Sequence, residues 1–332
     1  MDGGVAVNAA LFQITFACAR RNASTHEWQR PDRLGDASWS PFPRVTYPRA
    51  VDCNAIGVRT PVVGAFMNTV SGQNPYLVSV GWWEKSRLDE ALAAAAHGRK
   101  GVIHSGPDVN VIQRLNLETA PGAAMVDVGA NVGFMTFIAP TSGRPVFAIE
   151  PHSYNVAKLC EGWWLNLVNR TIVRQNLVHI FHAAAGATYR PHVTLFSGPD
   201  HHDQASLSED AVIMRTSPST SRGRGGHLRS ERMAMLTVDS IVPDDVPIGV
   251  VKIDVQGHET AVIRGMSSIL QRRTGYPEFI YFEHDPNLIR EAGGDVDEPL
   301  RLLTAAGYLC KRYGENQLCS KSQRSIRRYS YP

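Results

Sequence analysis

The chain has 332 residues, of which 43% are hydrophobic, 8% aromatic and 20% charged. This is ordinary globular composition, which excludes a largely disordered chain, a collagen-like repeat and a long coiled coil. At about 150 residues per domain, the length suggests about two domains. The 34 basic and 31 acidic side chains leave a net charge of +3, which is too small by itself to indicate a nucleic-acid partner.

Membrane and disulfide signals are weak. No apolar run reaches the length of about 18 residues that a transmembrane helix needs, and the apolar stretch Val5–Ala19 lacks the basic segment that precedes the core of a signal peptide. We therefore expect a soluble protein, cytoplasmic by default. The five cysteines include no C-x-x-C pair, so we expect reduced thiols, although Cys310 and Cys319 are spaced to face each other across a hairpin.

The N-terminal third carries few regular patterns. Residues 1–73 are predicted to form an irregular extension, rich in Pro, Arg, Asp and Trp between residues 22 and 60. Residues 74–118 are predicted to be a helical lead-in, because a capping-box-like start at Ser86 is followed by an Ala-rich run to His97. The segment Asp108–Glu118 fits either a helix or a strand.

From Met125 onward, short β-branched runs alternate with helical windows. The predicted strands are Met125–Val128, Val146–Ile149, Leu177–His182, Val193–Phe196, Val250–Asp254 and Phe279–Glu283. The predicted helices are Gly133–Ala139, Ser153–Leu167, His258–Gln271 and Asp297–Ala306. This alternation indicates an α/β fold with a doubly wound, mostly parallel, Rossmann-like sheet of seven strands over residues 119–322.

Two further segments belong to this domain plan. Gly307–Tyr313 and Gln317–Lys321 are separated by a short turn, which predicts a C-terminal antiparallel hairpin. The polar insertion 199–232 is interpreted either as a substrate lid or as a mobile loop, and residues 323–332 as a basic tail.

The strongest functional pattern is an apolar strand that ends in glycines, at Gly129 and Gly133. Glycines at the carboxyl end of a strand permit positive φ and let a ligand approach the backbone. The G-x-x-x-G spacing differs from the dinucleotide fingerprint, and no P-loop occurs. A tight strand-to-helix turn without a ligand is the alternative reading.

The next strand ends in Glu150, where an acid commonly accepts the ribose hydroxyls of a bound nucleoside. The alternative role for Glu150 is a favourable charge at the start of the following helix. Together, the glycine loop and Glu150 indicate a nucleoside pocket without a phosphate clamp, which suits S-adenosylmethionine.

Two later strands also end in polar residues, at Asp254 to His258 and at Glu283 to Asp285. Because ligands of open α/β sheets bind outside the carboxyl ends of the strands, we expect these side chains to converge on one crevice.

These motifs resemble the FkbM-type methyltransferases of the class I fold. The resemblance rests on residues 126–133, 149–151 and 236–240 and above all on Lys252-Ile253-Asp254-Val255-Gln256-Gly257-His258-Glu259. It implies S-adenosylmethionine as cofactor, bound by Asp127, Gly129, Ala130, Asn131, Gly133, Glu150, Pro151 and Asp254. The family usually has Glu where this chain has Gln256, which weakens any case for a metal, and no metal site is predicted.

Methyl transfer to an alcohol needs a base that takes the hydroxyl proton. Asp254 and His258 are the first candidates for that base, and Glu283 and His284 the second. Asp254 has an alternative role in orienting the amino group of the cofactor, His258 in the first turn of its helix, and Lys252 is expected to pair with an acid.

Three functions remain open at this point. The favoured one is O-methylation of a small molecule or glycan, on a sugar or secondary-metabolite hydroxyl. A second is methylation of RNA or another nucleic acid, motivated by basic residues such as Arg222, Arg224 and Arg328. A third is a catalytically silent binding module on the same fold. The oligomeric state is not predicted.

Overall fold

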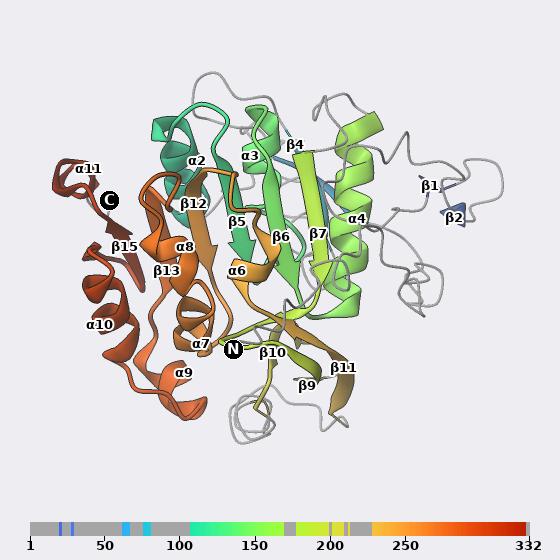
Figure 1. Ribbon diagram of the computed structural model, residues 1–332. Coiled ribbons are helices and arrows are strands. Elements are labelled where there is room, and N and C mark those ends of the chain that lie inside the picture. Colours follow the sequence, from blue (N-terminus) through green and yellow to red (C-terminus); the bar gives the residue numbers. More distant parts are fainter. Residues whose placement is uncertain are drawn as a thin grey trace, which may run out of the picture.

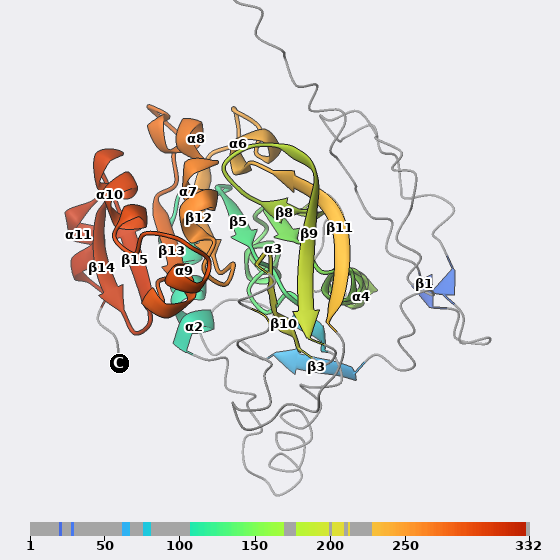
Figure 2. The ribbon, with the colours of Figure 1, turned by 90° about the horizontal axis from the view of Figure 1, so that it is seen from below.

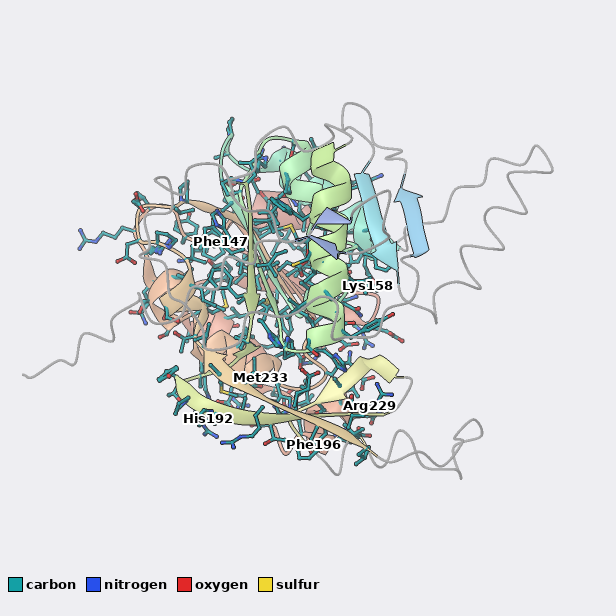
Figure 3. The ribbon with its side chains drawn as sticks, turned by 90° about the vertical axis from the view of Figure 1, so that its right-hand side faces the viewer. Phe147, Lys158, His192, Phe196, Arg229 and Met233 are labelled. Atoms are coloured by element: carbon teal, nitrogen blue, oxygen red, sulfur yellow. A yellow bond between two sulfur atoms is a disulfide. The ribbon has the colours of Figure 1, made fainter. Side chains whose placement is uncertain are left out.

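The computed structural model describes residues 107–168, 177–198, 201–208, 212 and 228–329, together with short strands nearer the N-terminus. Strands β1 (Arg20–Arg21) and β2 (Trp28–Gln29) pair antiparallel, as do β3 (Val62–Phe66) and β4 (Tyr76–Val80). Strand β4 lies beside helix α4 (Ser153–Val168), as Figure 3 shows. The predicted helix from Ser86 to His97 and most of the predicted irregular extension lie outside the described residues.

A seven-stranded sheet forms the centre of the molecule, in the order β14-β15-β13-β12-β5-β6-β7 (Figure 1). Its strands are β5 (Ala124–Val128), β6 (Val146–Glu150), β7 (Val178–His182), β12 (Ile248–Ile253), β13 (Phe279–Glu283), β14 (Leu309–Tyr313) and β15 (Asn316–Ser320). Strands β13, β12, β5, β6 and β7 run parallel, whereas β15 runs antiparallel to both β13 and β14. The predicted fold class, including the C-terminal hairpin, is confirmed.

Helices cover both faces of this sheet. On one face α2 (Pro107–Glu118), α3 (Ile138–Thr141) and α4 pack with the strands into one apolar cluster. On the other, α6 (Val238–Ile241), α7 (Glu259–Arg264), α8 (Ser267–Gln271) and α10 (Glu298–Ala305) form a second cluster. The remaining described helices are α9 (Pro286–Glu291) and α11 (Gln323–Arg327). None of the helices in the described ranges has the length and apolar character needed to cross a bilayer.

The helical windows needed correction at two places. The predicted helix Gly133–Ala139 is mostly turns followed by the short α3, and at its start Gly133 has φ +98°, which lies outside the right-handed helical region. The predicted helix His258–Gln271 divides into α7 and α8, because the carbonyl group of Gly265 accepts the N–H of Asp239 and the Asp239 carboxylate accepts the N–H groups of Ser268 and Ile269. The ambiguous segment Asp108–Glu118 is helical, within α2.

A second sheet, in the order β10-β9-β11-β8, lies across the carboxyl ends of the central strands (Figures 1 and 2). Its strands are β8 (Ala184–Ala185), β9 (Arg190–Gly198), β10 (His201–Ser206) and β11 (Arg229–Leu236). The prediction of Val193–Phe196 as a strand of the main sheet is therefore wrong: the strand belongs to this smaller sheet. Toward the C-terminal end of β9, the side chains alternate between buried and partly exposed, as expected for a strand in a sheet with only one face covered. The described ends of the insertion 199–232 are strands of this sheet.

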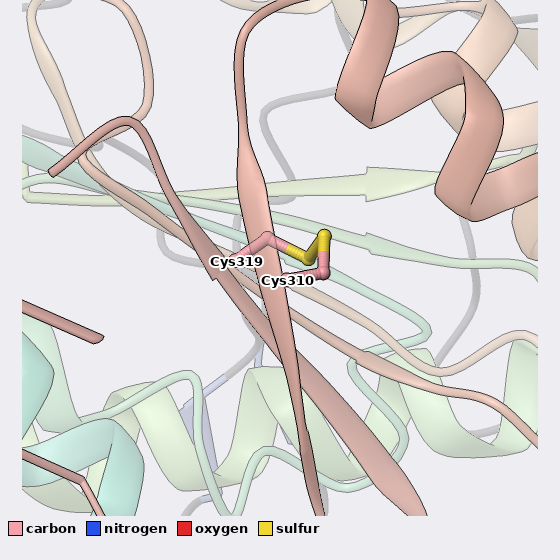
Figure 4. The surroundings of a disulfide bond; sticks show 2 residues. All are labelled: Cys310 and Cys319. Carbon is pink, nitrogen blue, oxygen red and sulfur yellow. A yellow bond between two sulfur atoms is a disulfide. The ribbon is translucent and has the colours of Figure 1, made fainter. Parts of the chain in front are cut away.

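The hairpin β14–β15 carries a disulfide between Cys310 and Cys319, which are directly opposite each other in the strand register (Figure 4). Their Cα atoms are 4.1 Å apart, the spacing of a closely approaching antiparallel pair. The expectation of reduced thiols is wrong for these two cysteines, whereas their predicted meeting across a hairpin is confirmed. Cys160 is buried and free.

Candidate active site

A cavity of about 380 Å³ opens at the carboxyl ends of β5, β6 and β12, and residues of the second sheet line its opposite side. Figure 2 shows the second sheet in front of these strand ends. It is lined by Val128, Gly129, Asn131, Ile149, Glu150, Pro151, Asn155, Ala183, Ala184, Ala185, Leu195, Ala205, Ser206, Leu207, Asp254, Val255, Gln256 and His258. The volume is within the range of pockets for small ligands. The predicted convergence of strand ends therefore occurs for three of the four strands.

Glu150 ends β6 and lies on the cavity wall with 4% of its surface exposed. One carboxylate oxygen accepts the backbone N–H of Asn131 at 2.8 Å, and the other accepts the N–H of His152 at 2.9 Å and the amide of Asn155 at 3.1 Å. Burial raises the pKa of Glu150 to about 7, although these donors act in the opposite direction. The carboxylate is thus held firmly and retains lone pairs for a ligand.

The loop after β5 is built by close packing of backbone on backbone. Gly129 has φ +75°, and a Cβ there would overlap the carbonyl oxygen of Asp254. A Cβ at Gly133 would lie 2.6 Å from the ring of Phe137 and 2.8 Å from Leu159. Both glycines are therefore required by packing against protein atoms, and only Gly129 also faces the cavity.

Asn131 contributes a polar atom to the same wall. Its φ is +50°, a left-handed conformation that Asn tolerates better than most side chains do. Its Oδ1 is buried and accepts no hydrogen bond from the described part of the chain. A ligand N–H or O–H group that reaches this oxygen would supply the hydrogen bond that a buried acceptor needs.

Asp254 follows β12 and presents 44% of its side chain to solvent and cavity. Gln256 Nε2 donates to its Oδ1 at 3.1 Å, and Lys252 Nζ lies 3.7 Å from its Oδ2. Each carboxylate oxygen therefore has a different partner, which orients the carboxylate at the cavity wall.

The turn from β12 into α7 brings Asp254 and Gln256 together. Gln256 and Gly257 have φ values of +56° and +97°, and the carboxylate of Glu259 accepts the backbone N–H groups of Val255 and Gly257 at 3.1 and 3.2 Å. Burial raises the pKa of Glu259 to about 7. This carboxylate stabilises the tight turn from inside.

The second pair of predicted bases lies behind the cavity wall. Glu283 accepts from Gln256 Nε2 at 3.2 Å, and burial, with the charges of Asp254 and Glu259, raises the pKa of Glu283 to about 8. The Nε2 atom of His284 contacts the carbonyl oxygen of Val296 at 2.8 Å. Neither residue lines the cavity, whereas His258 does.

Three of the predicted cofactor residues also lie away from the cavity. Asp127 is 1% exposed, accepts from Thr136 Oγ1 at 2.7 Å and lies 3.3 Å from Lys252 Nζ. Ala130 is buried, and its N–H donates to the carbonyl oxygen of Ile149. Together with Gly133, these residues support the loop, while Gly129, Asn131, Glu150, Pro151 and Asp254 line the cavity.

The apolar wall of the cavity was missed by sequence reasoning. Ala183–Ala185, Leu195 and Leu207 come from the second sheet and the segment leading into it. Short Ala and Leu runs are common in any core, so no signal in the sequence distinguished these residues as pocket residues. Asn155 was also missed, although its position five residues after Glu150, in the first turn of a predicted helix, was a usable signal.

A family model described as a methyltransferase FkbM domain matches residues 127–310, which is more than half of the 332 residues. The match begins at Asp127 within β5 and extends into the C-terminal hairpin, so it includes every strand end that lines the cavity. Among curated proteins, none matches the chain.

Several solved methyltransferase structures are similar to this chain at low sequence identity. Precorrin-6y C5,15-methyltransferase from Geobacter metallireducens is 14% identical, with 64% of this chain and 88% of that chain covered and a TM-score of 0.33. A SAM-dependent O-methyltransferase from Thermotoga maritima is 13% identical, with coverage of 81% and 80% and a TM-score of 0.33. A 16S rRNA methyltransferase from T. thermophilus is 13% identical, with coverage of 79% and 52% and a TM-score of 0.36.

Proposed function

The chain belongs to the FkbM methyltransferase family, and from this premise we propose that it methylates a hydroxyl group of a sugar, glycan or secondary metabolite. Methyl transfer with S-adenosylmethionine as the cofactor follows from membership of the family. The hydroxyl acceptor and the roles of the individual residues are our proposal.

The cavity residues fit S-adenosylmethionine. The Glu150 carboxylate is suited to accept both ribose hydroxyls, the orphaned Oδ1 of Asn131 to accept a ligand N–H group, and the Ala183–Ala185 wall to contact the adenine ring. When bound, the cofactor supplies a methyl group on a positively charged sulfur. The protein's part is then to align the acceptor, exclude water and receive a proton.

We assign the proton-accepting role to Asp254. The observation that carries the proposal is that its carboxylate lies on the cavity wall and is held on both oxygens, by Gln256 and by Lys252. A base held in one orientation can accept the proton of an incoming hydroxyl as the new O–C bond forms. His258 lines the same cavity and is assigned to contact the acceptor.

The charge of the lining favours a neutral acceptor. Among the described lining residues there is no Lys or Arg, while Glu150 and Asp254 contribute carboxyl groups. A phosphate or carboxylate close to the transferred methyl would be repelled by Asp254. This supports a neutral hydroxyl compound over a nucleic acid. Of the basic residues that motivated the RNA alternative, Arg222 and Arg224 lie outside the described residues, whereas Arg328 is described and exposed. A silent module is disfavoured because it would have no need for an oriented Asp254.

Substitution of Asp254 tests the assignment. We expect Asp254→Asn to lower methyl transfer by about 100-fold or more, the usual contribution of a general base, while the dissociation constant for S-adenosylmethionine changes by less than about tenfold. The measurement is transfer of labelled methyl from S-adenosylmethionine to a pool of sugars, glycosides and secondary metabolites, with calorimetry for cofactor binding. Asp244→Asn, an isosteric change at a fully exposed side chain that pairs with the largely buried Arg272, is the control, and transfer by Asp254→Asn at the control rate would overturn the role of Asp254.

Cofactor affinity is expected to depend on pH through Glu150. Its pKa is about 7 in the free protein, so the carboxylate that accepts the ribose hydroxyls is ionised above that pH and progressively protonated below it. Affinity should therefore be constant at higher pH and fall by up to about tenfold per pH unit below about 7. Calorimetry with S-adenosylhomocysteine between about pH 5.5 and about pH 8.5 measures this, and an affinity that rises on acidification would contradict it.

A further inference from the structure

Lys252 lies in β12, a strand whose residues are all buried in the middle of the sheet. Its side chain is 7% exposed. Burying an ammonium group is costly, and a well-packed apolar side chain in such a place is often as stabilising as an ion pair or more so. A lysine at this position therefore calls for an explanation beyond the stability of the strand.

The ammonium group has contacts on two different strand ends. It lies 3.3 Å from Asp127 Oδ1 and 3.7 Å from Asp254 Oδ2, and it donates to the carbonyl oxygen of Gly129 at 2.6 Å. Asp127 alone would suffice as a counter-ion in a buried pair. The shortest of the contacts, however, is to Gly129, which lines the cavity.

Besides its counter-ion Asp127, Lys252 contacts the loop after β5, at Gly129, and the proposed base after β12, Asp254. Gly129 immediately precedes Ala130 and Asn131, whose N–H donates to Glu150, so the position of its carbonyl group affects the loop that holds the ribose-binding carboxylate. Asp254 has its other oxygen on Gln256. Lys252 Nζ therefore joins Gly129 to the Asp254 carboxylate through a single atom.

We propose that Lys252 is a positioning residue that holds the Gly129 carbonyl group and the Asp254 carboxylate in a fixed spatial relation, so that the bound cofactor and the proposed base are aligned for transfer. This rests on the proposed function, because it assumes that the cofactor lies on the Gly129 loop. Lys252 does not act as a base itself. Burial alone lowers the pKa of Lys252, but the charges of Asp127 and Asp254 raise it overall, so the group stays protonated.

The test must separate this positioning role from neutralisation of the buried Asp127 charge. Lys252→Met alone would leave the buried Asp127 without a counter-ion and risk unfolding. The informative comparison is Asp127→Asn against Asp127→Asn/Lys252→Met, since both variants lack the buried Asp127 charge and they differ only in the ammonium group. Thermal unfolding of both establishes that they fold.

We expect the double variant to bind S-adenosylmethionine and S-adenosylhomocysteine at least about tenfold more weakly than Asp127→Asn does, the usual effect of losing a hydrogen bond from a charged donor. A second readout comes from Glu150, because the positive charge of Lys252 lowers the pKa of Glu150. Removal of that charge should move the midpoint of the pH dependence of cofactor binding to higher pH, which a loss of packing alone would not do.

Lys252→Arg provides an independent variant that keeps the buried positive charge for Asp127. Its longer, planar head group cannot place one nitrogen within reach of Asp127, Gly129 and Asp254 together, so we expect weaker cofactor binding than in the unsubstituted protein by about fivefold or more. Equal affinities in the Asp127→Asn pair, with an unmoved pH midpoint, would overturn the proposal, and so would Lys252→Arg with unchanged affinity. If the unsubstituted protein itself binds neither ligand, the proposed function has failed instead.

Discussion

Replacement of Glu150 by Gln is expected to weaken binding of S-adenosylmethionine by about 100-fold or more. The change keeps the shape of the side chain but removes the charge that receives the ribose hydroxyls, and each hydrogen bond to a charged group contributes about 1.5–3 kcal/mol. It also places an NH₂ group against one of the donors that now reach the carboxylate, from Asn131, His152 and Asn155. Calorimetry with S-adenosylmethionine and S-adenosylhomocysteine measures the loss.

A matched control comes from the surface of the same domain. Glu298→Gln makes the same chemical change at a partly exposed ion pair with Arg264, away from the cavity, and it should leave cofactor affinity unchanged. The two variants together separate a loss at the ribose site from a general effect of removing a carboxylate. Cofactor affinity in Glu150→Gln equal to that in Glu298→Gln, with both proteins folded, would remove the basis for a nucleoside site at the end of β6.

Gly129→Ala is the second change for which we expect a large effect. A methyl group there meets the carbonyl oxygen of Asp254, and the residue has φ +75°. The left-handed backbone costs about 1–2 kcal/mol for a non-glycine residue, and displacement of a packed neighbour costs about 1–3 kcal/mol more. Because a domain of this size loses roughly 2–4 °C of Tm per kcal/mol, Tm should fall by roughly 5–20 °C, and cofactor binding should be lost with the loop geometry.

Gly143→Ala separates the cost of the left-handed backbone from the cost of the contact with Asp254. Gly143 has the same φ of +75°, but a Cβ there would meet no atom within 4 Å, so this variant should lose only the backbone contribution of about 1–2 kcal/mol. The additional loss of stability in Gly129→Ala then measures the contact with Asp254. Similar Tm values for both variants would show that the close approach of the two strand ends does not constrain the site.

The strand ends of the site were predictable because each is a local pattern. An apolar run followed by Gly129, by Glu150 or by Asp254 identifies the residue at the end of a buried strand, and parallel strands bring their carboxyl ends to one edge of the sheet. That is why Gly129, Asn131, Glu150, Pro151, Asp254 and His258 were all named from the sequence and all line the cavity. The alternation of strands and helices likewise predicted the sheet that positions them.

The neighbours of those residues were not predictable in the same way. Asp127, Ala130 and Gly133 belong to the same motif as Gly129, yet they face the core, because side chains on a strand and in a tight turn point in alternate directions. Glu283 also ends a strand, but Gln256 lies between it and the cavity wall. A linear motif identifies the segment that reaches the site, whereas the backbone conformation decides which of its side chains enters.

The sequence by itself determined the alternation of strands and helices, the glycine turn and the acids at the ends of β6 and β12, because each depends on residues within a few positions of one another. Only the tertiary structure decided that β8, β9 and β10 close the cavity with an apolar wall, that Cys310 and Cys319 form a disulfide, and that Lys252 reaches Gly129. These features join segments from 9 to 123 residues apart, and such pairings depend on how whole elements pack, which no local pattern records.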